Sequence, residues 1–253
     1  LESLHQCELR VAGVPDTAPG RRADTTAIHG VFGGYLRNQV RCPACGYASN
    51  TYNSFLDLSL DVSKRTKDVT HALKAYTRSE TLDAQNAWKC DGCKKKVQAV
   101  KGMSIHRTPN VLTLQLRRGA FGGFGGGCGG GMFGGFMGGG GGGRKLNLEV
   151  GFSHKLDLTP FCSADTAKTE GSAPEYDLTG VLVHSGGSVN SGHYYSYVKT
   201  PAGGWALADD STVSGVNRHL VMRQQAYILF YTRRTPVTPA SRGVPADSIP
   251  PSL

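Results

Sequence analysis

The sequence predicts an α+β fold built mostly from antiparallel strands. Two observations indicate this. Between residues 35 and 62, apolar and polar residues alternate, as in YLRNQVRC and FLDLSLDV, which is typical of strands with one face in water. The last third of the chain holds four more strand-like runs, DLTGVLVHSG, GHYYSYVKT, GGWALADD and QAYILFYTRR.

Two helices and a buried strand complete this expectation. Residues 68–82 place Val69, Leu73 and Tyr76 on one helical face, with Asp68 before them as an N-cap. Residues 1–12 carry leucines at loosely helical spacing. The run VLTLQLRR, residues 111–118, is almost continuously apolar at first and predicts a buried strand.

The composition is that of a globular domain. The chain has 253 residues, of which 39% are hydrophobic and 19% charged, enough for one sizeable domain or two small ones. It holds no apolar run of the roughly 20 residues that a membrane helix needs, and no signal peptide opens it. We therefore expect no membrane association. Because the first residue is leucine, we expect the chain to be a piece of a longer protein.

One segment is low in complexity. Of the 25 residues in 119–143, 17 are glycine, interrupted by Phe121, Phe124, Phe133 and Phe136. Ordering so much glycine costs too much backbone entropy for a regular element, so we expect a flexible insertion that acts as a solvated spacer. Residues 13–24 are expected to form a loop, and the Pro- and Ser-rich tail from 235 to 253 is expected to be disordered.

Four of the seven cysteines form two C-x-x-C pairs. These are Cys42/Cys45 and Cys90/Cys93, separated by 44 residues and each followed by turn residues. Two such turns brought together supply the four thiolates of a structural zinc site. The alternatives are four reduced structural cysteines or a redox pair. Cysteines used in this way favour an intracellular, reducing compartment, the cytoplasm or the nucleus.

A histidine and an acidic pair stand at matching ends of neighbouring strands. His193 opens GHYYSYVKT, and Asp209-Asp210 closes GGWALADD after a turn at residues 201–204. In an antiparallel meander, the start of one strand lies beside the end of the next, so His193 and Asp209 should lie at the same edge. A carboxylate there would fix the tautomer of a catalytic imidazole. The alternative is a capped surface turn with an incidental acidic pair.

These motifs together resemble the ubiquitin-specific proteases. The resemblance includes GGYLRNQVRCPACGYASNTYNSFLDLSLDV, AWKCDGCKKKVQAVKGMSIHRTPNVLTLQLRR, RKLNLEVGFSHKLDLTPF and YDLTGVLVHSG…SGHYYSYVK…DDS…QQAYILFYTRR. It implies a papain-like cysteine hydrolase with thumb, palm and fingers that grips ubiquitin and cleaves after its C-terminal Gly-Gly. It implies that His193 is the general base, that Asp209 orients it and that Asp210 assists.

The resemblance also divides the chain and places a substrate channel. It implies a partial catalytic domain over residues 1–234, with zinc-binding fingers at about 35–115 and a palm at about 144–234. The loop at 186–192 matches one that covers the ubiquitin tail. The substrate-binding residues expected from it are Gly186, Gly187, Gly192 and Tyr194.

One family motif is missing from this chain. The run similar to GNTCFLNS that carries the family's nucleophile is absent, as is a QDAHEF-like run that would precede Leu1. Cys7, in LHQCELR, has no Gly-rich approach and no evident helix N-terminus to activate it. We therefore expect most of the thumb, and the nucleophilic cysteine, to lie upstream of Leu1. Cys7, Cys128 and Cys162 are expected to be free thiols.

Three classes of function remain open at this point. The first is a deubiquitinase to which this chain contributes the base and the fingers, binding ubiquitin and ubiquitinated proteins as a monomer. The second is an inactive ubiquitin-binding module. The third is a nucleic-acid-binding zinc ribbon, suggested by eight Lys/Arg against one acid in residues 89–118. That run also fits a solvated face, and with few aromatics for base stacking we do not expect nucleic acid binding.

Overall fold

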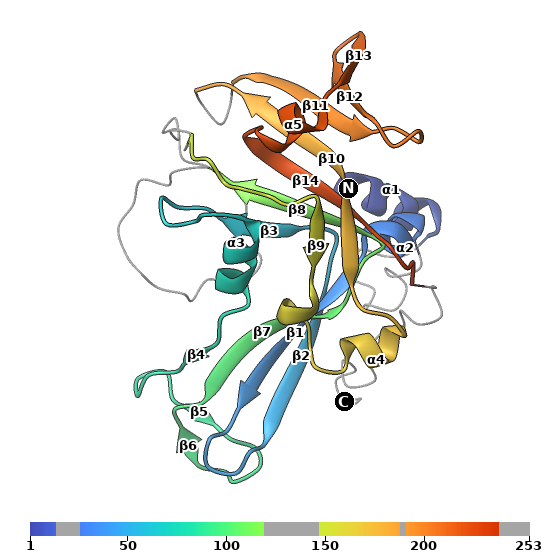
Figure 1. The fold of residues 1–253 in the computed structure, drawn as a ribbon. Coiled ribbons are helices and arrows are strands. Elements are labelled where there is room, and N and C mark those ends of the chain that lie inside the picture. The colour runs from blue at the N-terminus through green and yellow to red at the C-terminus, as the bar shows by residue number, and fades with distance from the viewer. Residues whose placement is uncertain (14–25, 119–146, 188–190, 238–253) are drawn as a thin grey trace.

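A computed structural model describes residues 1–13, 26–118, 147–187 and 191–237 (Figure 1). Within these ranges the protein is α+β with mostly antiparallel strands, as the sequence predicts. The predictions for the loop over 14–24, for the Gly-rich block 119–143 and for the tail beyond residue 237 lie outside the described residues. The start of the tail, expected to be disordered from residue 235, is instead ordered as far as Val237, which is buried and exchanges two hydrogen bonds with Asn110. None of the described helices is both long and apolar enough to span a membrane.

The larger of the two main sheets has eight strands. Seven follow the order β13-β12-β11-β10-β14-β8-β3, and β9 pairs with β10 beside them. All pairs are antiparallel except β3 with β8, where Leu58 lies opposite Leu114 in parallel register. The strands are β3 (Leu58–Asp61), β8 (Val111–Arg117), β9 (Lys155–Asp157), β10 (Glu175–Ser185), β11 (His193–Lys199), β12 (Trp205–Asp209), β13 (Thr212–Val216) and β14 (Ala226–Arg233).

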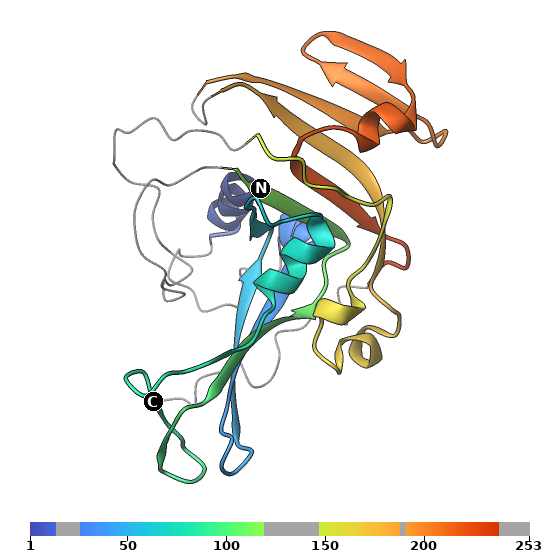
Figure 2. The same ribbon diagram turned by 60° about the vertical axis from the view of Figure 1, so that its left-hand side comes forward.

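The smaller main sheet extends away from the larger one, as both ribbon views show (Figures 1 and 2). Its order is β2-β1-β7-β4, all antiparallel, and a separate two-stranded hairpin of β5 and β6 lies at its far end. We refer to these two sheets together as the fingers. Their strands are β1 (Gly34–Arg41), β2 (Ala48–Phe55), β4 (Glu80–Thr81), β5 (Trp88–Lys89), β6 (Lys96–Val97) and β7 (Val100–Arg107).

Short helices pack beside the sheets rather than forming a layer of their own. The helix α1 contacts α2, which in turn contacts β8, while α3 packs on β3 and α4 on β7. The helices are α1 (Glu2–Val11), α2 (Ala27–Phe32), α3 (Val69–Tyr76), the 3-10 turn η2 (Thr159–Phe161), α4 (Thr166–Glu170) and α5 (Arg218–Met222).

The core lies along the middle of the large sheet. Leu112, Leu114 and Leu116 of β8 are fully buried, so one face of this strand accounts for the apolar run in the sequence. Two fully buried tyrosines add to it, Tyr231 on the adjacent β14 and Tyr176 on β10, one strand farther along the sheet. Burying each such side chain stabilises the fold by about 1.5–3 kcal/mol. The centre of the large sheet is therefore its most strongly stabilised part.

The helix predicted over residues 68–82 is shorter than expected. The predicted cap is present, because the Asp68 carboxylate accepts a 2.7 Å hydrogen bond from the backbone N–H of His71. The helix ends at Tyr76, and the Thr77 hydroxyl then donates to the carbonyl of Leu73. Residues 80 and 81 pair with β7 instead of continuing the helix, because strand pairing in the fingers outweighs their local propensity.

A buried ion pair joins β14 to α4. The Arg233 guanidinium donates to the Glu170 carboxylate at 2.7 Å, and the two side chains are 0% and 1% exposed. Thr108, in the turn before β8, donates to the same carboxylate from its backbone N–H at 2.7 Å and from its hydroxyl at 2.8 Å. The carboxylate is thus held by three donors from two other elements.

Replacing Glu170 with alanine is expected to lower the free energy of unfolding by about 3–5 kcal/mol, because it leaves the buried Arg233 charge with only the neutral acceptors Thr108 and Ser172. The matched control is Glu175→Ala, which removes an exposed carboxylate 3.2 Å from Arg234 and should cost about 1 kcal/mol or less. Urea unfolding of both variants measures the difference. Equal losses would show that the buried pair contributes no more than the surface pair.

Candidate active site and metal centre

The antiparallel strands β11 and β12 bring His193 and Asp209 together. His193 is the first residue of β11 and Asp209 the last of β12, and the two strands pair with Ser196 opposite Ala208. His193 Nε2 lies 2.5 Å from Asp209 Oδ1. The contact expected from the sequence is therefore present. It lies at the edge of the sheet, with the two side chains 50% and 40% exposed.

This contact determines how the imidazole is protonated. An ionised carboxylate only accepts hydrogen bonds. Nε2 must therefore carry a proton and donate a hydrogen bond to Asp209. In the neutral ring, Nδ1 is then left as the acceptor. The hydrogen bond to Asp209, followed by the charges of Asp209 and Asp210, raises the pKa of His193 above its ordinary value. An imidazole held in this way can take a proton at Nδ1 and keep its positive charge stabilised.

Asp210 occupies the turn between β12 and β13. Its φ of 48° is in the left-handed region, which aspartate tolerates better than most residues. Its carboxylate lies within 4.8 Å of the ligand atoms of His193 and Asp209, so this trio also has the composition of a metal site. However, two ligands of one zinc ion, each about 2.0 Å from it, lie about 3 Å or more apart. The 2.5 Å separation of His193 and Asp209 fits a direct hydrogen bond instead.

Replacing Asp209 with asparagine is expected to lower the pKa of His193 toward its ordinary value of about 6.5, since the amide accepts a hydrogen bond without a negative charge. In the native protein, the raised pKa makes this contact stabilising below the unfolded pKa. That contribution is lost as pH rises through the folded pKa. Asp209→Asn should therefore destabilise the protein more at pH 5.5 than at pH 9.

NMR titration of the His193 ring measures the pKa shift, and thermal melts at the two pH values measure the stability. The matched control is Asp210→Asn, which removes the same charge from the adjacent residue, where it contributes least to the pKa of His193. If both variants shifted the titration equally, the hydrogen bond to Asp209 would have no special role.

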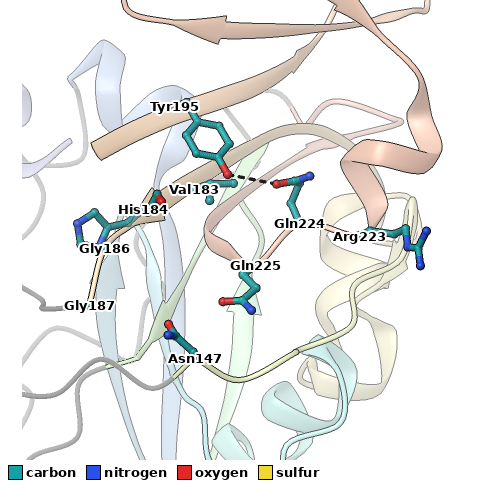
Figure 3. A pocket seen from close by; sticks show the side chains of 10 residues that line it. Asn147, Val183, His184, Gly186, Gly187, Tyr195, Arg223, Gln224 and Gln225 are labelled. Atoms are coloured by element: carbon teal, nitrogen blue, oxygen red, sulfur yellow. Dashed lines mark hydrogen bonds between the residues drawn. The ribbon is translucent and has the colours of Figure 1, made fainter. Parts of the chain in front are cut away.

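A cavity of about 450 Å³ opens next to this edge of the sheet (Figure 3). Two of the four predicted substrate-binding residues line it, Gly186 and Gly187. The other two, Gly192 and Tyr194, do not line it. Instead they contact His184, which does. Adding a Cβ to Gly186 would overlap the Ser191 carbonyl oxygen, so the backbone approaches closely there.

Polar side chains that the sequence did not single out complete the cavity wall. Tyr195 of β11 directs its hydroxyl toward Gln224, to which it donates at 3.4 Å (Figure 3). Arg223, Gln224 and Gln225, directly before β14, contribute further polar groups, and Asn147 adds one from the segment before β9. The one signal in the sequence was the pair Gln224-Gln225, polar residues directly before a buried strand.

The two C-x-x-C turns meet at the tip of the fingers. Cys42–Cys45 connects β1 to β2, and Cys90–Cys93 connects β5 to β6. The sulfurs of Cys42 and Cys93 are 3.9 Å apart, those of Cys45 and Cys90 are 3.6 Å apart, and all four lie within 4.8 Å of one another. Sulfurs at the corners of a regular tetrahedron about a zinc ion are about 3.8 Å apart, given Zn–S bonds of about 2.3 Å. The four residues therefore fit such an ion.

The backbone repeats the same turn at both cysteine pairs. The residue after the second cysteine has positive φ in each, 75° at Gly46 and 60° at Lys94. The N–H of the first cysteine donates to a carbonyl five residues on, from Cys42 to Tyr47 at 2.8 Å and from Cys90 to Lys95 at 2.9 Å. Two separate segments thus adopt one conformation that presents paired sulfurs to a common point.

The turns also adjust the acidity of the sulfurs. Burial opposes ionisation of Cys42, but hydrogen bonds from the backbone of Cys45 and Ala44 outweigh it and lower the pKa of Cys42 to about 7. A backbone hydrogen bond from Tyr47 favours the thiolate of Cys45. Burial and the three neighbouring cysteines outweigh that bond and raise the pKa of Cys45 to about 11. Without a cation, the cluster resists carrying several negative charges.

The other described cysteines lie elsewhere. Cys7 is exposed on α1, in a shallow depression with Glu2 and Arg10. Burial raises the pKa of Cys162 to about 12, so this thiol does not ionise near neutral pH. Cys128 lies outside the described residues. Neither Cys7 nor Cys162 belongs to the group of His193, Asp209 and Asp210.

Comparison with known proteins identifies the family. The family model described as ubiquitin carboxyl-terminal hydrolase matches residues 2–231. The chain belongs to the ubiquitin carboxyl-terminal hydrolase family. This confirms the resemblance drawn from the motifs, since several relatives carry that name.

Curated relatives of this ubiquitin carboxyl-terminal hydrolase chain come from fungi, plants and animals. It is 37% identical over 212 residues to the probable ubiquitin carboxyl-terminal hydrolase 16 of Schizosaccharomyces pombe, covering 84% of this chain and 41% of the relative. It is 35% identical over 254 residues to ubiquitin carboxyl-terminal hydrolase 23 of Arabidopsis thaliana, covering 99% and 26%. The chain therefore spans less than half the length of these relatives.

Solved structures confirm the predicted fold. A SAGA DUB module of Ubp8, Sgf11, Sus1 and Sgf73 bound to ubiquitin aldehyde contains a chain with a TM-score of 0.70 to this one and 31% identity. The alignment covers 92% of this chain and 47% of that one. The same module bound to monoubiquitin gives a TM-score of 0.68 and 32% identity, covering 86% and 44%.

Proposed function

We propose that this chain is the base-bearing part of a thiol-dependent deubiquitinase, which hydrolyses the peptide or isopeptide bond after the C-terminal glycine of ubiquitin. The observation that carries the proposal is the His193–Asp209 contact beside the cavity, in a chain of the ubiquitin carboxyl-terminal hydrolase family. Solved relatives bound to ubiquitin support a ubiquitin-binding role.

The proposed chemistry uses the two nitrogens of His193 differently. Nδ1 removes the proton from a cysteine thiol, and the resulting thiolate attacks the carbonyl carbon at the ubiquitin C-terminus. The imidazolium is stabilised by Asp209 through Nε2, and Nδ1 then returns the proton to the leaving amine. Asp210 adds negative charge nearby. We propose that the thiol comes from a segment outside this chain, because the sequence lacks a GNTCFLNS-like run and neither Cys7 nor Cys162, among the described cysteines, is grouped with His193.

We propose that the extended C-terminal tail of ubiquitin runs past the cavity. On its wall, Gly187 faces open space, whereas Gly186 lies close against the backbone at Ser191, and Tyr194 is 47% exposed nearby. Gly192 lies in the same loop. Side-chain amides such as Gln224 offer hydrogen bonds to the backbone of a bound tail.

We further propose that Cys42, Cys45, Cys90 and Cys93 hold one structural zinc ion, which fixes the tip of the fingers. The separations of their sulfurs support this assignment. A monomeric state and residence in the cytoplasm or nucleus remain predictions. The related Ubp8 structures are multi-subunit modules.

The second candidate is an inactive ubiquitin-binding module, which the lack of a described thiol at His193 favours. Activity separates the two. This chain alone is expected to show no hydrolysis of a fluorogenic ubiquitin amide, whereas the full-length protein should hydrolyse it and react with a ubiquitin thiol-directed probe. A full-length protein that binds ubiquitin without either reaction would be the inactive module. Labelling of Cys7 in the isolated chain would contradict the assignment of the nucleophile.

A further inference from the structure

His184 lies behind both residues that flank His193 in the chain. It is near the end of β10 and only 5% exposed. Its ring stacks on that of Tyr194, with centroids 4.4 Å apart and an interplanar angle of 25°. On the other flank, a Cβ added to Gly192 would overlap His184 Nε2 and the carbonyl of Ser185. The residues before and after His193 therefore rest on one imidazole ring.

A β-bulge brings a third ring to the same place. In the pairing of β10 with β14, Leu182 lies opposite Ile228 and Val183 opposite Ala226, so Tyr227 is an extra residue. Its ring centroid is 5.9 Å from that of His184 and 6.1 Å from that of Tyr194. Bulges commonly redirect a side chain next to an active site. Here the redirected ring encloses His184 against β11.

Hydrogen bonds connect this aromatic cluster to the core of the sheet. Gln115 of β8 donates to the Tyr227 hydroxyl at 3.3 Å, and Ser59 of β3 donates to Gln115 at 3.0 Å. The contacts thus run from β3 through β8 and β14 to His184 on β10 and Tyr194 on β11. These contacts connect the start of β11, which carries His193, to the buried centre of the large sheet.

We propose that His184 is a positioning residue: by packing under Gly192 and Tyr194, it holds the first residue of β11 so that the His193 ring faces Asp209. This inference rests on the proposed function for its effect on turnover. It also gives position 192 a steric reason to be glycine, and it leaves the exposed face of Tyr194 free for substrate. A displacement of about 1 Å in such a group can cost about 10²-fold in rate.

The test compares His184→Ala with His184→Phe in the full-length protein. Alanine removes the ring on which both neighbours of His193 rest, and phenylalanine keeps it. We expect His184→Ala to lower kcat about 10- to 100-fold with KM changed less than threefold, and His184→Phe to stay within about threefold of the wild type. In an NMR titration, the pKa of His193 should fall toward its ordinary value in the alanine variant only.

The matched control is His106→Ala, which removes another buried imidazole on β7, 5% exposed and in tilted contact with the Tyr52 ring at a centroid distance of 4.7 Å. It should leave the His193 titration unchanged. Should His184→Ala fail to fold, Gly192→Ala tests the same packing from the other side, with the same expected shift.

Three results would overturn the inference. They are an unchanged His193 titration in both His184→Ala and Gly192→Ala, an equal shift in His106→Ala, or a loss in His184→Phe as large as in His184→Ala. If no variant and not even the wild type hydrolyses ubiquitin amides, the proposed function fails. The titration still decides whether His184 positions His193.

Discussion

Loss of zinc, by chelation or by Cys90→Ser, is expected to unfold the tip of the fingers. Structural zinc in small peptide sites binds with about 10–16 kcal/mol, and that energy is folding energy, because the site does not exist in the unfolded chain. The β5–β6 hairpin has only two residues in each strand and pairs with no other described strand. Little besides the four sulfurs and the stacking of Tyr47 on Trp88 fixes its place.

Two measurements detect the loss of zinc and the unfolding of the finger tip. Elemental analysis should find one zinc per chain in the native protein and less in Cys90→Ser. The chain has two tryptophans, so a Trp205→Phe background leaves Trp88 at the tip of the fingers as its only tryptophan, whose emission can be excited without that of the tyrosines. Its emission should shift to the red when zinc is removed, as the ring loses its partner Tyr47 and meets water.

The control for this experiment is Cys7→Ser, which removes an exposed thiol on α1 and should change neither metal content nor fluorescence. Native protein without zinc, or a Cys90→Ser variant with unchanged metal content and melting temperature, would contradict the metal assignment.

Replacing His193 with alanine is expected to reduce kcat for a ubiquitin amide by about 10²–10⁴-fold in the full-length protein, the range that general base catalysis supplies. KM should change little, because the ring acts on the proton of the nucleophile and is not needed to bind ubiquitin. Asp209→Ala should also lower kcat, but by less, since the imidazole remains and only its orientation and charge stabilisation are lost.

Steady-state kinetics of the wild type, His193→Ala and Asp209→Ala measure these effects. His219→Ala serves as the matched control, because His219 is exposed on α5 and has no carboxylate partner among the described contacts. Equal activity of His193→Ala and the wild type would refute the base assignment. A loss confined to KM would instead place His193 in binding.

Local signals in the sequence predicted much of the fold. The alternation in β3, the Asp68 cap and the apolar run of β8 each describe contacts within one segment or one face, which periodicity records directly. β1 and β2 are strands as predicted, but their burial does not alternate from residue to residue. The same holds for the cysteine turns. Their spacing predicted a cluster, and the sulfurs do lie within reach of one ion.

Features that depend on distant partners were not predictable in this way. The parallel pairing of β3 with β8 joins residues 56 positions apart, as Ser59 and Gln115 show by their hydrogen bond. Residues 80 and 81 become a strand because β7 is available to pair with them. The packing of Tyr227 against His184 depends on a β-bulge at Tyr227. A bulge is a mismatch between two paired strands, and the sequence of neither strand shows it alone.

The His193–Asp209 contact spans only 16 positions along the chain and is made within one hairpin. Because such short-range contacts form as the hairpin closes, the proton-handling half of the site can assemble without the half that would carry the thiol. Under the proposed mechanism, the enzyme can therefore be divided. A fragment with the thiol and a fragment with this sheet, each inert alone, would regain activity only when a fused pair of interacting proteins draws them together. The division would turn a deubiquitinase into a reporter of protein association inside cells.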